Sequence, residues 1–207
     1  MKNARNLLAL AAAALMATSG MAMTKEEYNA AKDRIGADYK AAKAQCDTLK
    51  GNAKDVCMKE AKGREKVAKA ELEAQYKPSD KATYNVNEAR ADADYEVAKE
   101  KCDDQKGDAK DICVKDAKAA HVAAKENAKV QRAQAKPADS TAEKRADVAE
   151  AKKDAAEAQR EANYKAAKER CDTMSGDAKD KCVADAKRTH GQSTGKHVQP
   201  RLCRGFV

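Results

Sequence analysis

The chain has 207 residues, with 42 Lys and Arg against 34 Asp and Glu, a formal net charge of +8, no Trp and 3% aromatic residues. After residue 22 it holds 3 Leu, 2 Ile, 11 Val and 1 Phe, about 9% of that part, which excludes a thick apolar core. Ala and Lys dominate instead, and because both are strong helix formers the composition favours long, thinly packed helices.

Residues 1–22 have the three parts of a secretory signal peptide. Lys2 and Arg5 give a positive start, residues 7–17 form an unbroken apolar run, and small residues up to Ala22 suit cleavage. The alternative is a membrane anchor, but a spanning helix needs about 20 apolar residues and this run is shorter. We therefore expect an exported chain, periplasmic or secreted, with no transmembrane segment after cleavage, in a compartment where disulfides persist.

A twelve-residue pattern bounded by cysteines occurs three times, as CDTLKGNAKDVC, CDDQKGDAKDIC and CDTMSGDAKDKC. Before the first copy, apolar residues from Tyr28 to Leu49 recur at steps of three and four, which is typical of one face of an α-helix. The Gly in each copy predicts the left-handed residue that ends this helix, and the polar residue after it predicts the N-cap of a second helix. Each copy is therefore predicted to join two helices by a tight turn. The predicted turn residues are Gly51 and Asn52, Gly107 and Asp108, and Gly176 and Asp177.

The two cysteines of each copy are predicted to form a disulfide. They lie at similar distances from the turn on antiparallel helices, which allows Cα atoms to approach within the roughly 4.4–6.8 Å that a disulfide needs. Zinc is the competing use of cysteine, but zinc ligands usually come as Cys pairs about two to four residues apart, and these pairs are wider. The predicted disulfides are Cys46–Cys57, Cys102–Cys113 and Cys171–Cys182.

Prolines at 78 and 137 divide the chain into three hairpin repeats, at residues 23–78, 79–137 and 138–191. The predicted fold is all-α, with coiled-coil-like helices that are either loosely bundled or strung out in an extended chain. The expected helices cover about 24–50, 52–76, 80–106, 108–135, 140–175 and 177–189.

The C-terminal residues 192–207 depart from the helical pattern. This segment has no Ala, Asp or Glu, and Pro200 and Gly205 interrupt it. We expect a disordered tail, foreign in pattern to the rest of the chain, with Cys203 as an unpaired thiol.

Tyrosines and histidines also recur at fixed positions. His121 and His190 occupy a repeat position that Glu65 fills in the first unit, so we expect surface placement rather than a catalytic role. The repeated tyrosines are expected to cover the seam between the two helices of each hairpin, with a repeated ligand anchor as the alternative. These tyrosines are Tyr39, Tyr95 and Tyr164.

Charged residues of opposite sign stand at helical spacing along the chain, which predicts ion pairs on a solvated helix surface. Each such pair contributes only about 0.2–0.5 kcal/mol. The expected pairs are Asp55–Lys59, Glu65–Lys69, Asp111–Lys115 and Glu161–Lys165.

No motif in the chain indicates a reaction, since a Gly-rich phosphate loop, a nucleophile elbow and a HExxH sequence are all absent. We therefore expect a non-enzymatic protein without cofactor or metal. One remaining class is a structural or interaction protein of the cell envelope that binds another envelope protein. The other is an anion binder that uses Lys-rich helical faces for anionic envelope lipid or nucleic acid. Nucleic acid is disfavoured by the 34 acidic residues and the few aromatic rings.

The Tyr-Lys-Ala-Ala-Lys…Cys…Gly-Asp-Ala-Lys-Asp…Cys repeats behind a signal peptide resemble a group of small uncharacterised exported proteins of Gram-negative bacteria. Such proteins are often labelled TolA-like cell envelope biogenesis proteins. The resemblance covers about residues 1–191, and the TolA label rests on Ala/Lys/Glu-rich helix composition alone. TolA has an N-terminal membrane helix and a C-terminal globular domain that this pattern lacks, so the resemblance implies envelope location and helical habit, not energy transduction.

Overall fold

The computed structural model describes residues 23–191, and the predicted signal peptide, the predicted disordered tail and Cys203 lie outside this range. The described part is all-α, as predicted, and contains six α-helices and one short 3₁₀ turn. The helices are α1 (Lys25–Cys46), α2 (Gly51–Tyr76), α3 (Asp80–Lys101), α4 (Asp108–Ala135), α5 (Thr141–Asp172) and α6 (Gly176–Thr189), and the 3₁₀ turn η1 is Cys102–Asp104.

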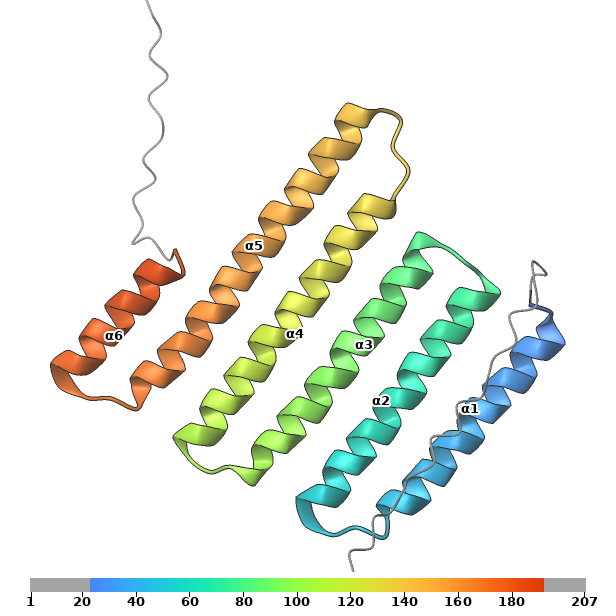
Figure 1. Cartoon of the computed structure of the whole chain (residues 1–207), viewed down its shortest axis with the longest axis horizontal. Coiled ribbons are helices and arrows are strands. Elements are labelled where there is room, and N and C mark those ends of the chain that lie inside the picture. The colour runs from blue at the N-terminus through green and yellow to red at the C-terminus, as the bar shows by residue number, and fades with distance from the viewer. Residues whose placement is uncertain (1–22, 192–207) are drawn as a thin grey trace, which may run out of the picture.

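The six helices lie side by side in chain order and form one antiparallel layer (Figure 1). Extensive contacts join only helices that are consecutive in the chain, and these include α2 with α3 and α4 with α5, which belong to different hairpins. The hairpins therefore pack against one another, which the sequence pattern left open. The turns between α1 and α2, α3 and α4, and α5 and α6 lie along one edge of the layer (Figure 1).

The interior of this layer is made of small side chains. Leu72 and Val86 are the largest aliphatic residues among the buried ones, and the other buried positions are Ala and Cys. The largest fully buried side chains are those of Cys46, Cys102 and Cys171, so the disulfides themselves occupy the best-shielded space. A layer with so little apolar burial benefits from covalent links, because each local disulfide restricts the unfolded chain.

Capping hydrogen bonds fix the starts of three helices. The Thr24 hydroxyl accepts from the backbone N of Glu27 while the Glu27 carboxylate accepts from the backbone N of Thr24, so these two residues form a capping box at the start of α1. Ser79 and Ser140 cap α3 and α5 by accepting from the third residue of each helix. The first helix of the second hairpin, α3, and the first helix of the third hairpin, α5, therefore begin directly after a serine cap that follows a proline.

The helix ends at the disulfide turns differ from the prediction. The first helix of each hairpin was expected to continue to residues 50, 106 and 175, but these helices end at Cys46, Lys101 and Asp172. The residues after them cross the gap between neighbouring helices, and hydrogen bonds of the i to i+3 type tighten the last turn. These bonds run from Leu49 N to Cys46 O, Gln105 N to Cys102 O and Met174 N to Cys171 O, each at 3.0 Å.

The glycines of these turns have positive φ, as predicted: +57° at Gly51, +54° at Gly107 and +56° at Gly176. The predicted N-caps Asn52, Asp108 and Asp177 are wrong, since Lys50, Gly107 and Ser175 hold the cap positions and none of them makes a side-chain capping bond. The chain reverses through the left-handed glycine directly into the helix, so the polar residue that follows already lies inside its first turn.

Candidate functional site

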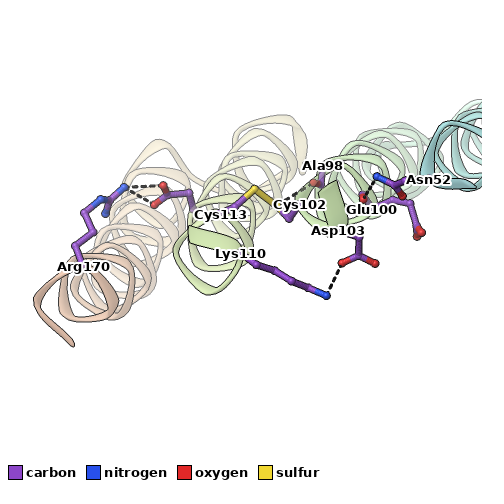
Figure 2. The surroundings of a disulfide bond; sticks show 9 residues. Asn52, Ala98, Glu100, Cys102, Asp103, Lys110, Cys113 and Arg170 are labelled. Carbon is purple, nitrogen blue, oxygen red and sulfur yellow. Dashed lines mark hydrogen bonds and ion pairs between the residues drawn. A yellow bond between two sulfur atoms is a disulfide. The ribbon is translucent and has the colours of Figure 1, made fainter. Parts of the chain in front are cut away.

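One disulfide joins the two helices of each hairpin. The Cα–Cα distances are 5.5 Å for Cys46–Cys57, 5.6 Å for Cys102–Cys113 and 5.5 Å for Cys171–Cys182. All three predicted pairings are therefore confirmed. Figure 2 shows the middle disulfide between the end of α3 and the first turns of α4. The disulfides hold the paired helices together at one edge of the layer.

An ion pair accompanies every disulfide. The Asp after the first Cys of each copy lies 3.0 Å from a Lys seven residues further on, in the next helix. The Asp103–Lys110 pair is drawn in Figure 2. These lysines were not predicted from the sequence, although their fixed spacing in all three copies could have identified them. The pairs are Asp47–Lys54, Asp103–Lys110 and Asp172–Lys179.

The layer has two broad faces, and different side chains of α2 and α3 reach each one. Arg64 and Lys66 lie two positions apart on α2, and Asp94 and Asp92 lie two positions apart on α3. Residues two apart on an α-helix point about 200° from each other, so Arg64 and Asp94 belong to one face and Lys66 and Asp92 to the other. We call the first the groove face and the second the seam face.

An open groove of about 780 Å³ runs between α2 and α3 on the groove face. Half-buried apolar residues, among them Val67 and Val97, line its floor. Two ion pairs bridge the groove from α2 to α3, and the residues lining it between these pairs include Arg64 and Asp94. The bridging pairs are Glu60–Lys101 at 3.4 Å and Glu71–Arg90 at 2.5 Å.

On the seam face, the Asp92 carboxylate connects three helices. It accepts hydrogen bonds from Lys66 of α2 at 2.7 Å and from Nε2 of His121 of α4 at 2.8 Å, and Lys125 of α4 lies 3.8 Å away. Partial burial acts to raise the pKa of Asp92, but the hydrogen bonds from Lys66 and His121 outweigh it, so this pKa lies below its usual value. The Asp92 side chain therefore stays charged in the folded layer at neutral pH.

The His121 ring lies parallel to the Tyr95 ring, with 4.6 Å between centroids and 17° between planes. The Lys118 ammonium lies over the Tyr95 ring, 5.2 Å from its centroid. The His121 side chain is only 11% exposed, so its predicted surface placement is wrong. In the seam between α3 and α4, the Tyr95 ring covers one face of the His121 ring, and Asp92 accepts from Nε2. The Nδ1 atom has no hydrogen-bond partner among the described residues.

The same repeat position has different surroundings in the other hairpins. Tyr39 and Glu65 line a hollow of about 200 Å³ between α1 and α2, and Tyr164 and His190 line one of about 500 Å³ between α5 and α6. The expectation that these tyrosines lie over the seams therefore agrees with all three hairpins. Among residues 23–191, the stacked Tyr–His pair occurs in the middle hairpin alone, so the Tyr positions do not form three equal sites.

Two of the four ion pairs expected within single helices form, and in the other two cases the lysine pairs with a carboxylate of the neighbouring helix. The expected pairs Glu65–Lys69 and Glu161–Lys165 form, each at 2.6 Å. The other two lysines point to the next helix instead, Lys59 to Glu96 at 3.0 Å and Lys115 to Glu169 at 3.5 Å. These cross-helix pairs replace the expected pairs with Asp55 and Asp111.

Two further polar contacts tie separate hairpins together. The Arg170 guanidinium donates to both carboxylate oxygens of Asp116 at 2.6 Å, which links α5 to α4 (Figure 2). The Asn52 side chain donates to the backbone O of Glu100 at 3.1 Å, which links α2 to α3 (Figure 2). These bonds fix how neighbouring hairpins sit within the layer.

Comparison of the chain with protein-family models, curated proteins and solved structures gives no match. Within residues 23–191, no helix is both long and apolar enough to cross a membrane. In the same range, no three His, Cys, Asp or Glu side chains are grouped so that they could hold a metal ion.

Proposed function

We propose that the chain is an exported, non-enzymatic interaction protein of the cell envelope, periplasmic or secreted, whose helical layer presents its broad faces to a partner protein. The likeness to TolA-like envelope proteins supports the envelope location and the helical habit in this proposal, but not the energy-transducing function of TolA. The disulfides, the signal-like N-terminus and the mixed surface charge all suit such a role.

The observation that carries the proposal is the single layer. Most protein domains bury their helices between two or three layers, whereas α1 to α6 pack only edge to edge, and both faces remain available for contact. Three disulfides and several cross-helix ion pairs hold the layer together, so a partner would meet a preformed surface and lose little affinity to ordering it.

The alternative function, binding of a polyanion, has less support because several lysines on the seam face already pair with carboxylates. Lys59, Lys66 and Lys125 all lie within 3.0 Å of a carboxylate oxygen. A nucleic acid or anionic lipid would have to compete with these carboxylates, and its binding would depend steeply on salt.

In-cell photo-crosslinking separates the two functions. A photoreactive residue at Lys99, which is exposed on the seam face seven positions after Asp92, should give one fixed adduct with an envelope protein. The matched control is the same residue at Ala119, which is buried. The adduct should persist at about 0.5 M salt, because a contact that survives such screening is not mainly electrostatic. Failure to capture a protein, or capture of only nucleic acid or anionic lipid that salt abolishes, would contradict the proposal.

A further inference from the structure

The groove between α2 and α3 carries one unmatched charge on each wall. Arg64 of α2 and Asp94 of α3 line the groove, are exposed, and make no ion pair within residues 23–191. The close contact between Gly63 and Ala93 places the two helices in register here. Arg64 and Asp94 follow these residues in opposite directions, so they stand within about 3 Å of the same level along the groove.

The ions on the two walls alternate in sign. From one end of the groove to the other, α2 presents acid, base and acid, and α3 presents base, acid and base. On α2 these residues are Glu60, Arg64 and Glu71, and on α3 they are Lys101, Asp94 and Arg90. Each wall is therefore the electrostatic complement of the other.

We propose that the groove face binds a second copy of this chain, with the two-fold axis lying along the groove. This axis places α2 of one copy over α3 of the other, so Arg64 meets the second copy's Asp94, and the reverse contact forms at the same time. Both unmatched charges are satisfied in one step, and this is the occupant that the groove's own charges specify.

The charge pattern also rejects the other simple arrangement. A two-fold axis across the helices would place α2 over α2, so that Glu60 faces the second copy's Glu71. It would place α3 over α3 in the same way, with Arg90 facing the second copy's Lys101. Both contacts are repulsive, and juxtaposed like charges disfavour an interface strongly. The groove therefore specifies the register of the pair as well as its occupant.

The size of the surface suits a reversible dimer. Helices α2 and α3 have 26 and 22 residues, so each is at least about 33 Å long. Two such helices, each about 10 Å wide, present about 700 Å², close to the roughly 800 Å² per partner of a stable interface. Helices α1 and α4, which face each other across the same axis, extend the contact. Val67 and Val97 supply apolar area, while the ions mainly set the orientation.

Charge reversal tests the dimer directly, with the full-length oxidised chain in sedimentation equilibrium at low salt. Arg64→Glu places a carboxylate opposite the second copy's Asp94, and Asp94→Arg places a guanidinium opposite the second copy's Arg64. Each variant alone should dimerise about tenfold more weakly, because two attractive contacts become repulsive. An equimolar mixture should recover the wild-type affinity, because every contact between the two variants is attractive.

Lys62→Glu is the control, since Lys62 is exposed on α2 and does not line the groove. It should leave dimerisation unchanged. A wild-type chain that stays monomeric at high micromolar concentration would overturn the proposal, as would a mixture that associates no better than its components. The dimer goes beyond the proposed function and does not depend on it. The envelope partner is tested at Lys99 on the seam face, and the dimer is tested at Arg64 and Asp94 on the groove face. Either proposal can therefore be contradicted while the other stands.

Discussion

The close approach of α2 and α3 at Gly63 gives a sharp test of how the first two hairpins pack. A Cβ atom at position 63 would lie 2.9 Å from Cβ of Ala93. Carbon atoms normally stay about 3.5–4.0 Å apart, so Gly63→Ala forces the two helices to separate by several tenths of an ångström or more. Overpacking of this kind costs about 1–3 kcal/mol, while replacing a helical Gly with Ala gains about 1 kcal/mol. We expect a net loss of about 1 kcal/mol in the free energy of unfolding.

Gly36 provides the matched control, because a Cβ atom there meets nothing within 4 Å. Gly36→Ala should therefore stabilise the chain by about 0.5–1 kcal/mol. In an Ala93→Gly background, Gly63→Ala should also become stabilising, since the opposing methyl group is gone. Urea unfolding of the oxidised chain, followed by circular dichroism, measures all four variants. If Gly63→Ala stabilises wild type as much as Gly36→Ala does, then α2 and α3 are not in close contact and the packing between hairpins is wrong.

Three further predictions address the disulfides, the Asp92 cluster and the stacked ring pair. Replacing both Cys102 and Cys113 by Ser should lower the free energy of unfolding by about 3 kcal/mol in urea unfolding, the loop-closure value for a separation of 11 residues; an unchanged midpoint would contradict this. Because the folded pKa of Asp92 is depressed, its stabilising effect is present above the ordinary Asp pKa and is lost as pH falls below about 4. Asp92→Asn should therefore flatten the fall in melting temperature between about pH 5 and 2, and a parallel fall in both proteins would refute the linkage. Tyr95→Ala should cost about 2 kcal/mol in thermal unfolding through lost packing on His121, while Tyr95→Phe should be near neutral; equal effects would argue against stacking as the cause.

Local features of the fold followed from the sequence because the repeat restates them three times. The disulfide pairings and the positive-φ glycines depend on residues close together in the chain, and both were predicted correctly. The exact helix ends and the N-caps were not predicted correctly. The chain needs several residues to cross between adjacent helices, and helix propensity does not indicate how many. Helix termini are the places where such a local rule is least decisive.

The single layer could not be predicted, because Ala-rich helices look similar on every side. The sides that pack are distinguished by long-range details such as the Gly63–Ala93 contact and the Lys59–Glu96 pair, which have no local signature. His121 was misplaced for a related reason. Glu65 fills its repeat position in the first hairpin, which suggested a solvated site, but the burial of His121 depends on Asp92 and Tyr95 of another helix.

The distance between the outer helices α1 and α6 tests the single layer most directly. Ala37 and Ala184 are exposed on these helices and can carry non-cysteine spin labels without disturbing the disulfides. Five helix spacings of about 8–10 Å separate α1 from α6 in the layer, so pulsed dipolar spectroscopy should report about 40–50 Å. Dilution with unlabelled chain removes distances between copies. A main distance near 20 Å, about two helix spacings, would mean that the hairpins fold back into a bundle and would contradict the account.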